Sequence, residues 1–174
     1  MVDQSTGERR ARAMALLLRD GSPSDADSQR VLEQYKLYVE MADRVSNRRQ
    51  QANTYLLSIN SVLLTALGLV IEFVDTESWR AAAMLTLIPA SGFAVSVIWF
   101  FLIRSYRQLN SGKFQVIHMI EALLPIAPYD AEWEALGRGE SFQLYWPFSH
   151  VEQYVPVVFA LLYIVGMALV LTLF

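Results

Sequence analysis

The chain has 174 residues, no cysteine and a formal net charge of −3 at neutral pH. The absence of cysteine excludes disulfides and thiolate metal sites, and the nearly balanced charge gives no case for nucleic-acid binding. Hydrophobic residues make up 54% of the chain, which is a high share for a water-soluble protein of one domain's length.

The apolar residues gather in three runs, at 55–74, 81–103 and 155–174. Each run is about 20 residues or longer, which is the length of α-helix that crosses about 30 Å of hydrocarbon. The predicted fold class is therefore all-α, an integral membrane protein with three transmembrane helices and long cytoplasmic helical extensions. The alternative is a soluble protein with three buried helices, but so short a chain has too little amphipathic material to cover them.

Residues 1–24 are polar and are expected to form a mobile tail, with room for a short helix at 8–19. Such a basic helix could rest on an anionic membrane surface, or the segment could be frayed and solvated. The apolar run at 14–18 is too short for the core of a signal peptide, so the first span is expected to direct membrane insertion.

A charged helix is expected over 25–53, with Ser24 or Asp25 as its N-cap. Its apolar residues recur every three or four positions and form a narrow stripe that should pack on another helix, of the same chain or of a neighbour. This apolar stripe consists of Val31, Tyr35, Tyr38, Ala42 and Val45. No proline or glycine separates the helix from the first span at 54–74, so one continuous helix should pass from water into the bilayer.

The first span carries a polar face whose members recur every three or four positions. Its members are Thr54, Ser58, Ser61, Thr65, Gly68 and Glu72, with Asn60 on a neighbouring face. Small and hydroxyl-bearing residues of this kind can pack helices closely together, or they can line a wet path around an oligomer axis. In the second case a ring of Glu72 carboxylates would favour cations. The pattern is compatible with helix packing and with a water-filled path.

The second span, at 81–103, follows a short connector that predicts a tight helical hairpin with Trp79 at the membrane interface. Small residues, among them Gly92 and Ser96, predict close helix contacts, and Pro89 predicts a kink. Region 104–148 is expected to be cytoplasmic, with a helix to about residue 124, a short helix at 129–136 with Asp130 near its cap, and Trp146 at the interface. Ser149 and Glu152 then fit a capping box that opens the third span, at 149–174.

The positions of the cations predict the orientation. Only Arg80 lies beside the connector between the first two spans, whereas the other cations near the spans lie on the opposite side. The positive-inside rule therefore places the N-terminus and region 104–148 in the cytoplasm and the C-terminus in the periplasm. Arg48 and Arg49 can act as anchors of this topology or can bind anionic lipid. Further interface anchors are Arg104, Arg107, Trp79 and Trp146.

No motif indicates catalysis, a cofactor or a bound metal. His118 lies one turn from Glu121 and His150 lies beside Glu152, but neither pair has a known ligand spacing, and histidines on a helix surface are the simpler interpretation. The serines lack the context of an activated nucleophile. The prediction is a non-enzymatic protein without a cofactor, whose partners are membrane lipids and further copies of itself.

Several ordered blocks of the sequence resemble the RipA-like octameric membrane proteins of bacteria. They are YKLYVEMAD at 35–43, RRQQAN at 48–53, LNSGKFQVIH at 109–118, LPIAPYDAEW at 124–133 and the pair Val151 and Glu152. The resemblance covers roughly residues 30–174 and implies a bacterial inner-membrane protein that self-assembles, as an octamer, without an established activity. A scaffold or an envelope-stress role would fit such a protein. The alternative is an oligomeric channel or pore-forming effector lined by the polar face of the first span.

Overall fold

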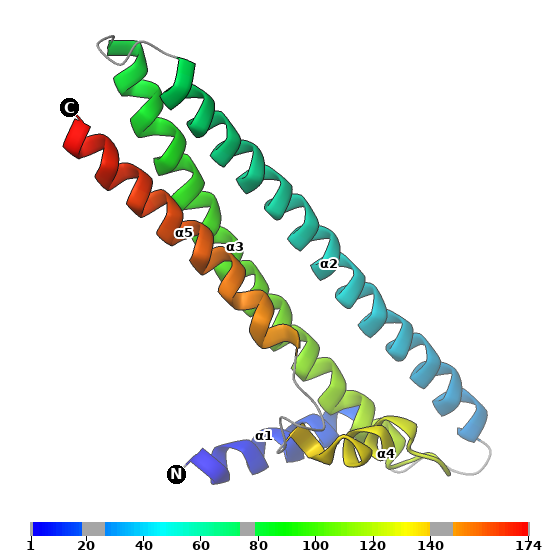
Figure 1. Cartoon of the computed structure of the whole chain (residues 1–174). Coiled ribbons are helices and arrows are strands. Elements are labelled where there is room, and N and C mark those ends of the chain that lie inside the picture. Colours follow the sequence, from blue (N-terminus) through cyan, green and yellow to red (C-terminus); the bar gives the residue numbers. More distant parts are fainter. Residues whose placement is uncertain (1, 19–26, 74–78, 140–147, 174) are drawn as a thin grey trace. The chain divides into compact units, whose positions relative to one another are not determined.

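The computed structural model describes residues 2–18, 27–73, 79–139 and 148–173. These residues form helices and short turns without a strand, which confirms the all-α prediction. In chain order the helices are α1 (Val2–Leu17), α2 (Ser28–Phe73), α3 (Trp79–Glu121), α4 (Pro128–Ala135), the short 3₁₀-helix η2 (Gly137–Gly139) and α5 (Phe148–Leu173), as Figure 1 shows.

Three of these helices are long and apolar enough to cross a membrane, namely α2, α3 and the segment Val151–Val170 of α5. The three spans predicted from the apolar runs are therefore present as helices. Contacts divide the chain into two compact units. The extension unit comprises Met1–Val45 and Leu109–Trp146, and the spanning unit comprises Ser46–Gln108 and Pro147–Phe174.

Helix α2 has 46 residues and continues without a break from its charged half into the first span. At 1.5 Å per residue it is roughly 70 Å long, about twice the thickness of a hydrocarbon core. The predicted N-caps Ser24 and Asp25 lie outside the described residues. Helix α3 is similarly long, with 43 residues, and it continues through Pro89.

Helix α3 ends three residues earlier than expected, at Glu121. The amides of Leu123 and Leu124 donate to the carbonyls three residues before them, at 2.9 and 3.0 Å, and so close a tight turn. Helix α4 then begins at Pro128, a residue whose fixed φ suits the first helical position. Asp130 lies within the first turn of α4 and not at its cap, because the cap position is Ala127, which has no side-chain hydrogen bond.

The chain leaves α4 through three residues in the left-handed region. Gly137, Arg138 and Gly139 have φ values of 63°, 52° and 75°. Two glycines adopt this backbone without steric conflict, which explains why the predicted short helix stops here. Helix α1 is a separate element that begins at Val2 and ends at Leu17, so it starts six residues before the predicted helix.

The extension unit has a core in which the apolar stripe of α2 meets the end of α3. Its buried members are Tyr35, Ala42, Ile117 and Ile120, and its half-buried members include Val31, Tyr38, Phe114, Leu124 and Tyr129. The ammonium group of Lys113 also lies 4.8 Å from the centre of the Tyr38 ring. Val45 is half-buried as well. The stripe therefore packs on a helix of the same chain.

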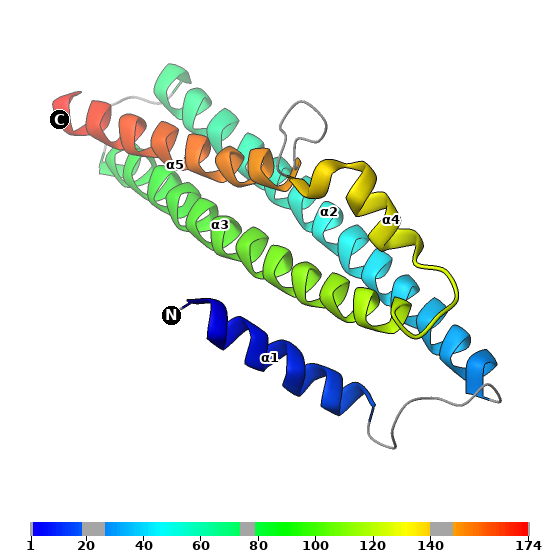
Figure 2. The same ribbon diagram turned by 90° about the horizontal axis from the view of Figure 1, so that it is seen from below.

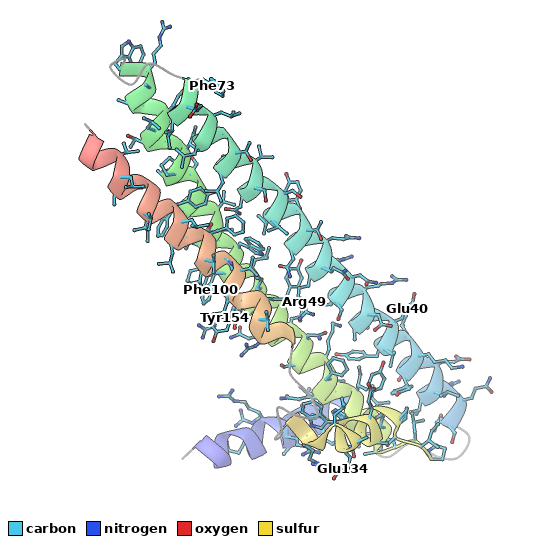
Figure 3. All side chains as sticks on the ribbon, viewed as in Figure 1. Glu40, Arg49, Phe73, Phe100, Glu134 and Tyr154 are labelled. Atoms are coloured by element: carbon cyan, nitrogen blue, oxygen red, sulfur yellow. The ribbon has the colours of Figure 1, made fainter. Side chains whose placement is uncertain are left out.

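In the spanning unit, α5 runs alongside α3 in both views of the ribbon (Figures 1 and 2). Leu67 of α2, Leu85 of α3 and Val170 of α5 form one apolar cluster, so all three spans contribute to this core. The rings of Trp99 and Phe159 add a second contact between α3 and α5, with centroids 6.0 Å apart. Large apolar side chains such as Phe73 and Tyr154 lie outside the packing, with 78% and 69% exposure (Figure 3).

Candidate functional site

The polar face of the first span lies outside the packing of the protomer. Its six members, Thr54, Ser58, Ser61, Thr65, Gly68 and Glu72, are all exposed along α2. No atom lies within 4 Å of the position that a Cβ would take at Gly68, so this part of the face is open space. The helix α2 thus presents a row of small and polar residues that no other described part of the chain covers.

The hydroxyl groups on this face donate their hydrogen bonds within α2. The Oγ atoms of Ser58 and Ser61 and the Oγ1 atoms of Thr54 and Thr65 lie 2.9 to 3.1 Å from the carbonyl oxygens four residues earlier. A hydroxyl that bonds to its own helix does not require water or a neighbouring donor. The face can therefore enter an apolar environment, or approach another helix closely, without leaving an unsatisfied O–H group.

Asn60 does not belong to this face, although the sequence placed it among the candidates. It is completely buried in the core of the spanning unit. Its Oδ1 lies 3.0 Å from Oγ of Ser96, and the hydroxyl of Tyr163 donates to its backbone carbonyl at 3.0 Å. Its Nδ2 donates to the carbonyl of Leu56 at 2.8 Å. Asn60 therefore links α2 with α3 and α5. It points away from the polar face because one step along a helix turns a side chain by about 100°.

Tyr163 reaches Asn60 across a glycine of α3. A Cβ at Gly92 would lie 2.1 Å from the Tyr163 ring, so only glycine permits this approach of α5 to α3. The small residues of the second span predicted close helix contacts, but Tyr163 lies in an apolar run that gave no sign of this role. Asn53 lies seven residues before Asn60, so the sequence places both on the same neighbouring face as hydrogen-bonding residues, and in the structure Oδ1 of Asn53 accepts a hydrogen bond from the indole Nε1 of Trp99 at 2.9 Å.

The predicted interface anchors differ in their surroundings. Arg48 and Arg104 are exposed, and Trp79 is 76% exposed with the guanidinium of Arg80 5.7 Å from its ring centre. Arg107 instead donates to Oε1 of Gln153 on α5, at 2.9 Å. Arg49 also turns towards α5, where its Nε lies 3.6 Å from Oε2 of Glu152. Trp146 lies outside the described residues.

The capping box proposed for the third span is not formed as predicted. Ser149 lies inside α5, which begins no later than Phe148, and its side chain lies outside the described residues, as does that of His150. The Glu152 carboxylate faces Arg49 on α2. Ser149 is therefore not the N-cap, and Glu152 takes part in an ion pair between helices.

In the extension unit, the buried carboxylate of Glu121 organises the contacts. It accepts hydrogen bonds from the Tyr35 hydroxyl at 2.8 Å and from the amides of Tyr129 and Asp130 at 2.8 and 3.0 Å. Burial raises the pKa of the Tyr35 phenol, and the hydrogen bond to Glu121 and the negative charge of that carboxylate raise it further. Glu121 thus supplies the N-terminal cap that the sequence of α4 lacks.

His118 lies beside this carboxylate, with Nδ1 3.5 Å from Oε2 of Glu121 and 3.9 Å from Oδ1 of Asp130. The described residues nevertheless contain no group of three histidine, aspartate or glutamate side chains arranged to hold a metal ion. The Glu121 carboxylate accepts hydrogen bonds from two amides of α4, and Asp130 lies in the first turn of that helix, so His118 lies beside this turn.

The sequence model of the octameric membrane protein family (8xMP) matches residues 32–172. The chain belongs to this family. The match begins within α2 and ends within α5, so it includes the three spans, the polar face and the Glu121 cluster. The resemblance seen in the sequence blocks is therefore confirmed. No curated protein and no solved structure matches the chain.

Proposed function

We propose that this member of the octameric membrane protein family is a non-enzymatic scaffold that assembles as a homo-octamer through the polar face of α2. The observation that carries the proposal is the division of α2 into two surfaces. The apolar stripe of its first half is covered by α3 of the same chain, whereas the polar face of its second half is exposed. The uncovered face is a polar surface available for contacts between protomers.

Helix packing within a membrane explains why this face suits a neighbouring protomer better than lipid. Lipid tails are as apolar as leucine, so contacts between helices gain mainly from close packing of small residues. The hydroxyls of the polar face bond to their own helix, and Gly68 leaves room for a second backbone. Larger exposed residues, Tyr55, Val62 and Leu69, recur every seven positions on the adjoining side of the helix.

The assembly would lie in the bacterial inner membrane with its N-terminus in the cytoplasm and its C-terminus in the periplasm. The arginines beside the spans support this orientation through the positive-inside rule. An envelope or stress role suits a scaffold of this kind, because the extension unit offers exposed helices such as α4 on the cytoplasmic side.

A pore is the second candidate, and it is favoured by the exposed Glu72 near the end of the first span. If the polar face surrounded the axis of the octamer, eight copies of this carboxylate would form a ring that attracts cations. Packing and conduction make different demands on the same face. A helix contact requires small side chains, whereas a pore requires water beside the hydroxyl oxygens.

The test is the double substitution Ser61→Leu and Thr65→Leu, measured by native mass spectrometry of the full chain in detergent. Overpacking of about 1–3 kcal/mol at every contact should dissociate the octamer. Thr86→Leu with Ser91→Leu is a matched control, because both residues are exposed on α3 and Thr86 also bonds to its own helix, at 2.8 Å.

The proposal requires that the α2 variant loses the octamer and that the α3 control keeps it. An intact octamer in the α2 variant would overturn packing through this face. If that intact octamer also showed altered ion flux in liposomes, the pore would replace the scaffold as the function.

A further inference from the structure

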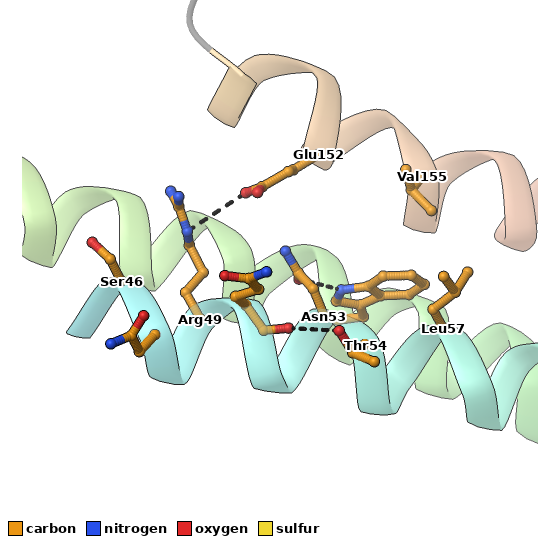
Figure 4. A pocket seen from close by; sticks show the side chains of 10 residues that line it. Ser46, Arg49, Asn53, Thr54, Leu57, Glu152 and Val155 are labelled. Atoms are coloured by element: carbon orange, nitrogen blue, oxygen red, sulfur yellow. Dashed lines mark hydrogen bonds and ion pairs between the residues drawn. The ribbon is translucent and has the colours of Figure 1, made fainter. Parts of the chain in front are cut away.

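A pocket of about 500 Å³ lies between α2 and α5 in the spanning unit, beside Trp99 of α3 (Figure 4). One part of its lining is polar and includes Ser46, Gln50 and the facing pair Arg49 and Glu152. The other part is lined by the apolar side chains of Leu57, Trp99 and Val155. On α2 the polar residues of the lining precede the first span, and Leu57 lies within the span. The pocket is therefore polar at the level of lipid headgroups and apolar at the level of acyl chains.

The two charged side chains face each other without a hydrogen bond. Arg49 Nε and Glu152 Oε2 are 3.6 Å apart, and neither atom has a hydrogen-bond partner within the described part of the chain. Both atoms are buried, and their side chains are only 21% and 17% exposed. The two groups form an ion pair, but at 3.6 Å each still lacks the hydrogen-bond partner that a buried charged N–H or carboxylate oxygen gains most from. The pocket therefore offers one position for an anion and one for a cation.

This pairing selects the charge of the ligand. An anion alone would bind Arg49 but would be repelled by Glu152, and a cation alone would meet the opposite conflict. A zwitterion satisfies both side chains at once. Glu152 further favours a primary ammonium over a quaternary one, because only the primary ammonium can donate a hydrogen bond to Oε2.

We propose that the pocket binds a phospholipid with an ethanolamine headgroup. The phosphate lies on Arg49, the primary ammonium lies on Glu152, and an acyl chain extends past Leu57 and Val155. Trp99 lines the apolar part with its ring, while its indole N–H is held by Asn53 at 2.9 Å. The lining residues of the site all belong to one protomer.

Native mass spectrometry of the full chain released from nanodiscs tests this proposal. The nanodiscs contain equal amounts of phosphatidylethanolamine, phosphatidylcholine and phosphatidylglycerol with the same acyl chains. We expect the wild-type protein to retain phosphatidylethanolamine about tenfold over each of the other two, the preference that one charge-assisted hydrogen bond provides. Equal retention of the three lipids would overturn the proposal, and this arm needs no variant that has to fold.

Two substitutions then assign the two charges. Glu152→Gln should reduce the preference for ethanolamine over choline to about one, because the anion that selects the ammonium is lost. Arg49→Gln should lower retention of all three lipids at this site. Arg48→Gln is the matched control, since Arg48 is the exposed neighbour that does not line the pocket, and it should leave retention unchanged.

Two further results would contradict the proposal. If Arg48→Gln reduced retention as much as Arg49→Gln, the lipid would be held by general surface charge and not in the pocket. If soluble glycerophosphoethanolamine displaced the retained lipid at equal concentration, the acyl chain would contribute nothing, and the ligand would be a water-soluble zwitterion instead.

Discussion

At the scale of single residues, buried polar side chains form hydrogen bonds that join the helices. Glu121 is 1% exposed and accepts one hydrogen bond from α2 and two from the start of α4. Asn60 and Ser96 are equally buried and form a corresponding contact within the spanning unit. Such groups favour one arrangement of helices, because any other arrangement would leave them buried without partners.

The substitution Glu121→Ala tests the first of these contacts. It would leave the Tyr35 hydroxyl and two backbone amides without their acceptor, which should destabilise this part of the extension unit by about 3 kcal/mol. Hydrogen exchange of the amides in Pro128–Ala135 should then accelerate by roughly a hundredfold. Glu132→Ala, at an exposed position of α4, should have little effect. Unchanged exchange in the Glu121 variant would mean that α4 does not depend on this cap.

At the scale of elements, the close approach of α5 to α3 depends on a glycine, Gly92, which has no side chain. The Tyr163 ring occupies the space where a Cβ of Gly92 would lie, and its hydroxyl donates a hydrogen bond to the backbone carbonyl of Asn60 on α2. Ring and hydroxyl together connect three helices, and such specific contacts matter for their register because lipid-facing and core-facing residues are both apolar here. The shape of this contact and its hydrogen bond thus help to fix the packing of otherwise similar helices.

Gly92→Ala should therefore lower the stability of the spanning unit by about 1–3 kcal/mol through overpacking. The measurement is the thermal midpoint of helix loss by circular dichroism in detergent, which should fall by several degrees. Gly112→Ala is the matched control, because nothing lies within 4 Å of its Cβ position and alanine is the better helix former. A midpoint that falls equally in both variants would contradict the role assigned to Gly92.

At the scale of the whole molecule, α2 takes part in both units. Its first half provides the apolar stripe of the extension unit, and its second half provides the core residue Asn60 and the exposed polar face. An octamer formed through that face would connect the spans of neighbouring protomers and leave the core of each extension unit intact. The orientation of this long helix then decides on which side of the membrane the extension units lie.

Single cysteines test the orientation, since the chain has no cysteine of its own. Thr76→Cys, in the connector between α2 and α3, should react with a membrane-impermeant maleimide added to spheroplasts. Ser111→Cys, at an exposed position of α3, should react only after the inner membrane is permeabilised. The reverse labelling pattern would place the N-terminus in the periplasm and refute the proposed topology.

The sequence by itself determined the all-α class, the three spans and the family, because run length, helical periodicity and ordered blocks are properties of the local chain. The lack of a breaker before the first span likewise pointed to the single helix α2. Only the tertiary structure decided which polar residues of that helix are buried: Asn60 lies in the core and Ser61, one position on, lies on the open face. The contacts of Glu121 with Tyr35 and of Arg49 with Glu152 could not be predicted from the sequence either. Periodicity shows which residues share a face of one helix, but it contains no information on which helix, far along the chain, will cover that face.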